Sequence, residues 1–275
     1  LKEKKGKKEE QEKISFYMSF VQKSRILGLT IFVFSLISIN VILILSQSFD
    51  FKSNPTPGNY YKNFKVYNAG DALRDKQDIS SYGYAIPYID GSTSISRLGR
   101  VTPNNYIFKP LMIISGILMC MFWYYQRKIL DKLIPEKNNN KIFYLGVTTG
   151  ICLIIHISLL GVKIDNNIYK IFIRLVLALS VICGVLTKLH YVKTIKILKE
   201  KNIFFKNVLF SFQYYLVYFV IFLIFACIPL LLIENAKQLV LIIEWNAFVI
   251  IFLFYFIYYF SWNNHSVIQP PPSTL

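Results

Sequence analysis

The stretch ILGLTIFVFSLISINVILILSQSF, residues 26–49, carries no charged side chain between Arg25 and Asp50. A membrane-spanning helix needs about 20 consecutive apolar residues, because each residue adds about 1.5 Å of length and the hydrocarbon layer is about 30 Å thick. This stretch is therefore long enough to cross a bilayer. It also exceeds the apolar region of about 7–15 residues in a secretory signal, so a retained helix is expected rather than a cleaved leader.

Five further apolar blocks follow along the chain. The predicted spans are residues 26–49, 110–126, 142–162, 171–187, 207–233 and 239–262. Composition agrees with this pattern, since 54% of the 275 residues are hydrophobic, 17% are charged and the mean hydropathy is +0.43. A soluble domain usually carries about 25% charged residues, so ordinary soluble folds are excluded. The expected fold class is an all-α integral membrane protein, a bundle of six transmembrane helices in residues 26–262.

The distribution of Lys and Arg predicts the orientation. Six spans place both termini on one side, and that side holds eight basic residues in 1–25, five in 127–141 and six in 188–206. The short loops of the opposite side hold three, which predicts that both termini are cytosolic. Residues 1–25 are then a basic cytosolic tail, expected to be disordered over its Lys/Glu-rich first half, and 263–275 form a proline-containing cytosolic tail. The net charge of +16 is spread between apolar blocks, which argues against nucleic-acid binding.

The connection between the first two spans, residues 50–109, is predicted to be a large extracytoplasmic loop. It is rich in Gly and Pro, which favours turns, and in Tyr, which favours the membrane interface. We expect a folded cap at the level of the headgroups. Four residues are singled out as a device that leads the loop into the second span: Ser96 and Gly99 in a turn, Pro103 at the helix entry and Phe108 as an interfacial anchor.

Two segments of this loop, SISRLG at 94–99 and PNNYIF at 103–108, together with the pair Glu244-Trp245, resemble the Frag1/DRAM/Sfk1 family. The chain carries Arg97 where many members of that family carry Asp, and six-span DUF998-type membrane proteins are a related alternative. The resemblance implies six spans with a large loop after the first. It also implies a role such as lipid-anchor remodelling, lipid asymmetry or autophagy.

Three ionisable residues fall within predicted spans at similar depth. Counted from the predicted outer ends, His156 lies about 9 Å deep, Arg174 about 6 Å and Glu244 about 10 Å. Ionisable groups inside a bilayer are costly and mark functional sites by default. Three interpretations are open: a structural Arg174–Glu244 pair hydrogen-bonded to His156, an outer-leaflet site in which Arg174 contacts a lipid phosphate, or catalysis by His156 with Glu244.

No catalytic, nucleotide or metal motif accompanies these residues, and the four cysteines all lie inside apolar blocks, which favours packing. We therefore expect no metal and no cofactor. The predicted function is lipid organisation or trafficking without catalysis, in an endomembrane or the plasma membrane, with membrane lipids and membrane proteins as partners. Two alternatives remain open, namely a lipid-anchor remodelling enzyme or factor and a structural subunit of a larger membrane complex.

Overall fold

The computed structural model describes residues 2–48, 86–100, 104–135, 137–162, 167–200, 207–230, 233 and 236–262. Within these residues the chain forms eight helices and no strand. In chain order the helices are α1 (Lys2–Ser48), α3 (Pro87–Asp90), α4 (Ile95–Leu98), α5 (Asn104–Leu133), α6 (Asn140–Leu159), α7 (Asn167–Glu200), α8 (Asn207–Leu230) and α9 (Lys237–Ser261).

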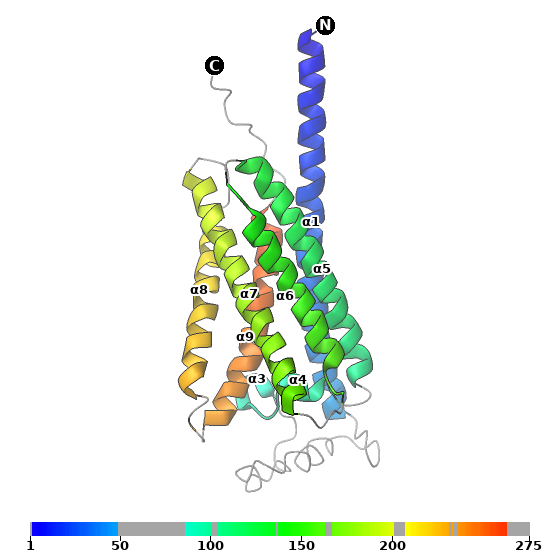
Figure 1. The fold of residues 1–275 in the computed structure, drawn as a ribbon, viewed down its shortest axis with the longest axis vertical. Helices are drawn as coiled ribbons and strands as arrows, with labels where there is room; N and C mark the ends of the chain where they lie inside the picture. The colour runs from blue at the N-terminus through cyan, green and yellow to red at the C-terminus, as the bar shows by residue number, and fades with distance from the viewer. Residues whose placement is uncertain are drawn as a thin grey trace.

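Six of these helices are long and apolar enough to cross a membrane, which confirms the predicted number of spans. The apolar segments are Ser19–Ser46, Asn104–Leu133, Asn140–Leu159, Asn167–Leu198, Val208–Leu230 and Gln238–Ser261. The long helices run alternately up and down, and each packs on its neighbour in sequence while α9 returns to α1 (Figure 1). The result is a closed ring of six helices. We call the end where α3 and α4 lie the cap end, and the end where α9 finishes the termini end.

Several helices extend beyond the predicted spans. Helix α5 begins at Asn104, inside the predicted loop, and runs through Pro110. Proline is tolerated inside membrane helices because neighbouring groups can satisfy the backbone carbonyl that it leaves free. Helix α7 continues past Thr187 to Glu200, since apolar residues recur at helical spacing beyond the end of the predicted span.

Helix α1 also begins far earlier than predicted, at Lys2, and its first half projects beyond the rest of the bundle at the termini end (Figure 1). The expected disorder of the first residues is therefore not what the structure shows for residues 2–13. Lys, Glu and Gln, which are frequent in this segment, are good helix formers.

Glycines bring α5 and α6 into close contact. A Cβ atom on Gly150 would lie 2.6 Å from the backbone oxygen of Gly116, and a Cβ on Gly146 would lie 2.2 Å from the ring of Trp123. Membrane helices associate largely through packing, and small residues let their backbones approach. Gly146 and Gly150 stand four residues apart on α6, so a single face of that helix accepts α5.

An aromatic cluster fills the half of the ring nearest the termini end. Phe122 of α5 packs edge-on against Tyr255 and Tyr258 of α9, with ring centroids 5.0 and 4.9 Å apart. Tyr191 of α7 contacts Phe254 of α9 at 5.7 Å. Edge-on aromatic pairs contribute about 0.5–1.5 kcal/mol beyond the area that they bury. The cluster therefore joins α5, α7 and α9 across the ring.

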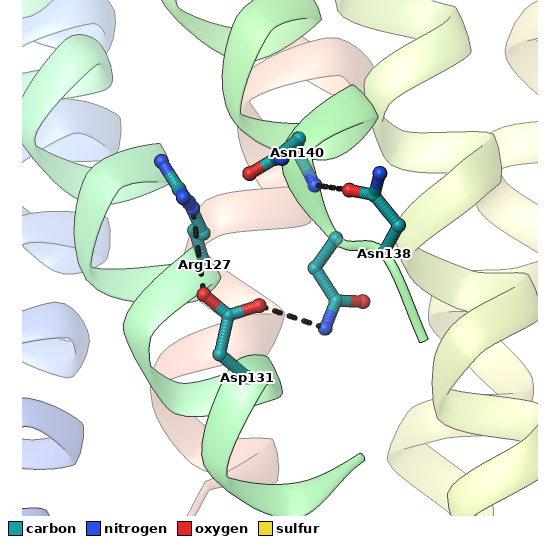
Figure 2. A network of polar contacts seen from close by, with 5 residues as sticks. Arg127, Asp131, Asn138 and Asn140 are labelled. Carbon is teal, nitrogen blue, oxygen red and sulfur yellow. Dashed lines mark hydrogen bonds and ion pairs between the residues drawn. The ribbon is translucent and has the colours of Figure 1, made fainter. Parts of the chain in front are cut away.

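Polar side chains near the Asp131 carboxylate hold the connection between α5 and α6. Figure 2 shows Asp131 facing Arg127 on its own helix, with 3.4 Å between the charged atoms. Asn139, which is buried, donates to the other oxygen of Asp131 at 3.1 Å, and the Asn140 amide donates to Asn138 at 2.9 Å. This network fixes the turn into α6 at the termini end.

The glycine contact makes a prediction about stability. Gly146→Ala should lower the free energy of unfolding by about 1–3 kcal/mol, because the new methyl group meets a fully buried tryptophan ring that has no room to move. Thermal unfolding of the purified protein in mild detergent, followed by circular dichroism, measures the effect.

Gly184→Ala on α7 is the matched control, since its new methyl would approach the Thr149 side chain at 3.1 Å rather than overlap an indole ring. Equal melting temperatures for the two variants would show that α5 and α6 are not packed as described.

Candidate functional site

The cap, residues 86–100, is built from two short helices separated by turns. Pro87 opens α3, where its fixed φ suits the first helical position, and Gly91 ends it with a left-handed φ of 58°. Ser94 then caps α4, its side chain accepting from the Arg97 amide at 3.2 Å. A side chain on Gly91 would also collide with the backbone of Gln238 on α9. Glycine is therefore required both by the turn and by the contact with α9.

Three consecutive residues of α9 hold the cap. The Glu244 carboxylate accepts a hydrogen bond from the Ile95 amide at 3.2 Å, at the first turn of α4. Trp245 donates from Nε1 to the Thr93 carbonyl at 2.7 Å, and Asn246 donates to the Tyr88 carbonyl at 2.9 Å. These contacts join α9 to residues far apart in sequence, so they fix the cap as a unit.

Of the four residues predicted to lead the loop into the second span, the structure describes Ser96, Gly99 and Phe108. Gly99 lies against Phe108, since a Cβ there would come within 2.6 Å of the ring, and Phe108 is buried. Ser96 lies 3.2 Å from the Ser94 hydroxyl. Pro103 lies outside the described residues. The contact between Gly99 and Phe108 supports a structural role for these positions in turning the chain into α5.

Asn104, which the sequence interpretation passed over, is a central polar contact of the cap. Its amide is fully buried and donates to the Ser46 hydroxyl at 2.6 Å and to the Leu98 carbonyl at 3.2 Å. It thereby ties α5 to both α1 and α4. A buried amide at the start of a membrane helix is the signal that could have revealed it, because such a group must find partners within the protein.

The three intramembrane residues do not form one cluster. His156 is buried and its Nδ1 lies 3.2 Å from the Ile173 carbonyl, which links α6 to α7. Glu244 faces α4 and the charge of Arg97, whereas Arg174 is exposed on α7. The structure describes both charged residues and has no ion pair between them. The predicted Arg174–Glu244 pair is therefore wrong. The physical reason is the ring order, which places α8 between α7 and α9.

A different cluster forms instead. Arg100, at the end of the cap, lies within electrostatic reach of Arg97 and Arg174, and we call these three residues the arginine cluster. Partial burial and the positive charges of the other two arginines lower the pKa of Arg100. Gly161, with a φ of 83°, turns the chain after α6 and packs beside the Arg100 backbone. The cap and the end of α6 therefore hold Arg100 near α7.

Two carboxylates, Asp90 and Glu244, are described at the cap end. Asp90 accepts from the amides of Ile86 and Ser92 at 2.7 and 2.8 Å, which ties it to its own turn. Glu244 interacts electrostatically with Arg97. Like charges held together raise one another's free energy, so an anion at the cluster would be stabilised.

The surface around Arg174 is apolar and faces away from the bundle. Ile171, Leu175 and Leu177 are all exposed, with Leu175 at 62%. Two turns further along α7, Leu179 and Ile182 are exposed as well. Arg174 is therefore a cation on an apolar surface that the bundle leaves uncovered.

A second cation, which the sequence interpretation assigned to a connection, lies inside the bundle. Lys188 is 5% exposed and its Nζ lies 5.6 and 5.2 Å from the rings of Phe254 and Tyr255. Cation–π contacts stabilise a desolvated ammonium by about 2 kcal/mol. The continuing helical periodicity of Tyr191 and Ile195 was the available signal that α7 extends past Lys188.

The contact between Glu244 and α4 can be tested by proteolysis. Glu244→Ala removes the acceptor of the Ile95 amide, which should cost about 1–3 kcal/mol and make trypsin cleavage after Arg97 and Arg100 faster by roughly tenfold or more. Glu244→Gln keeps an acceptor oxygen and should change the rate much less. Cleavage of the alanine variant at the wild-type rate would show that this contact does not hold the cap.

Comparison with protein-family models, with curated proteins and with solved structures finds no match for this chain.

Proposed function

We propose that this chain is a polytopic membrane protein that binds an anionic lipid headgroup at the arginine cluster and acts, without catalysis, in lipid organisation or trafficking. The observation that carries the proposal is that Arg100 lies within electrostatic reach of Arg97 and Arg174, and that Arg174 lies on an exposed apolar face of α7. Arginine suits phosphate because its planar guanidinium donates two parallel hydrogen bonds.

The geometry of the site supports a lipid rather than a soluble anion. Arg174 stands within the first two turns of α7, and exposed Ile171 and Leu175 flank it on the same helix. A phosphate at the guanidinium would place the attached acyl chains along these side chains. A free anion would gain nothing from that apolar surface.

The distribution of basic residues indicates the leaflet in which the arginine cluster lies. The segments at the termini end carry most of the Lys and Arg outside the large loop, which favours a cytosolic termini end. The cap end and the arginine cluster then belong to the extracytoplasmic leaflet. The resemblance of the loop segments to the Frag1/DRAM/Sfk1 family adds support for a role in lipid handling.

The position of His156 favours a binding site over an enzyme. Its ring is 6% exposed and turned toward the Ile173 carbonyl, so it serves the contact between α6 and α7. Among the described residues, no group of three or more His, Cys, Asp or Glu could hold a metal ion. Lipid-anchor remodelling is the alternative function. Chemical conversion of a retained lipid by the purified protein would favour that alternative.

Lipid retention tests the proposal. Wild type and the variants Arg174→Ala and Arg100→Ala are purified in mild detergent, and co-purified lipids are quantified by mass spectrometry. Each charge-assisted contact with phosphate contributes about 1.5–3 kcal/mol, so each variant should retain roughly tenfold less of one anionic lipid class.

Lys109→Gln is the matched control, because Lys109 is a cap-end cation whose Nζ already donates to the Ser158 carbonyl at 3.3 Å. The same lipids at the same levels in all four proteins would contradict a headgroup site. If the lipids were unchanged and other membrane proteins co-purified stably with the chain, the result would favour a structural subunit of a larger membrane complex.

A further inference from the structure

A groove of ≈ 240 Å³ lies between α7 and α8 at the termini end, far from the arginine cluster. Its walls are of two kinds. Val192, Ile195 and Phe210 give an apolar side, and Lys196, Tyr214 and Tyr215 give a polar rim. The residues come from the last turns of one apolar segment and the first turns of the next, Asn167–Leu198 and Val208–Leu230.

The position of these residues places the groove at the boundary between hydrocarbon and water. Tyrosine and lysine side chains are enriched at that boundary, because each has an apolar stem and a polar tip. Lys196 is exposed, and Tyr215 is 69% exposed. The groove is thus open to the membrane surface rather than enclosed in the bundle.

The rim is positively charged. Lys196 lines the groove, and Lys193, three residues earlier on α7, is exposed as well. Glu200 follows Lys196 by four residues, but no ion pair joins these two described side chains. No carboxylate is among the residues that line the groove.

We propose that this groove binds an anionic phospholipid of the leaflet at the termini end, with its phosphate at Lys196 and an acyl chain along Val192, Ile195 and Phe210. The distribution of basic residues makes this the cytosolic leaflet, where anionic lipids attract lysines close to the membrane surface. Arg174 and Lys196 are 22 residues apart on α7, or about 33 Å along the helix. The two sites therefore serve opposite leaflets and are independent.

Lipid stoichiometry tests the proposal. The full-length protein in neutral detergent is titrated with dioctanoyl phosphatidic acid, and bound lipid is counted by native mass spectrometry, with dioctanoyl phosphatidylcholine as the baseline for non-specific binding. Lys196→Gln should weaken binding at one site about fivefold, while Lys196→Arg should keep it. Lys128→Gln, at the termini end of α5, is the matched control and should bind like wild type.

The double variant Lys196→Gln/Arg174→Ala separates this groove from the arginine cluster. Loss of one lipid with Lys196→Gln and of a further one in the double variant supports the groove. If the count falls with Arg174→Ala and not with Lys196→Gln, the groove proposal is overturned and the arginine cluster stands. Displacement of the lipid by an equal concentration of inorganic phosphate would show that the groove takes a soluble anion, which also overturns the proposal.

Discussion

The half-buried carboxylate of Glu244 accepts a hydrogen bond from the first amide of α4, and the position of the arginine cluster depends on this contact. A helix leaves its first amides without partners inside the helix, and a carboxylate buried near a bilayer is costly unless it accepts hydrogen bonds. The bond from Ile95 to Glu244 meets both needs. Because Trp245 binds the same cap, Arg97 and Arg100 are carried on a support that cannot shift without breaking these contacts.

The charged groups at the two ends of the bundle have different structural support. At the cap end, Arg100 is positioned by the turns of the cap and by the chain after α6. At the termini end, the aromatic cluster joins α7 to α5 and α9, while the α7–α8 contact leaves an open groove beside Lys196. Each proposed lipid site therefore combines a cation with apolar side chains, which are exposed on α7 at the cap end and line the groove at the termini end.

The sequence was sufficient to predict the six spans, because hydropathy and length depend on local composition alone. The depths of His156, Arg174 and Glu244 could also be counted along their helices. The sequence could not predict which of these residues face one another, because depth in the membrane carries no information on the order of helices around a ring. The pair of Arg174 with Glu244 failed for this reason, and the arginine cluster escaped notice because two of its members lie in a loop whose fold the sequence does not specify.

Photo-crosslinking tests the central claim most directly. The purified protein is placed in nanodiscs that contain an anionic phospholipid with a photoreactive group near its phosphate, irradiated, digested and mapped by mass spectrometry. A site at the arginine cluster predicts crosslinks concentrated on peptides that contain residues 95–100 and 167–176, with loss of both in Arg174→Ala. Crosslinks spread evenly over the exposed apolar faces of α5 and α8, and unchanged by that substitution, would contradict a lipid site built by the cap and α7.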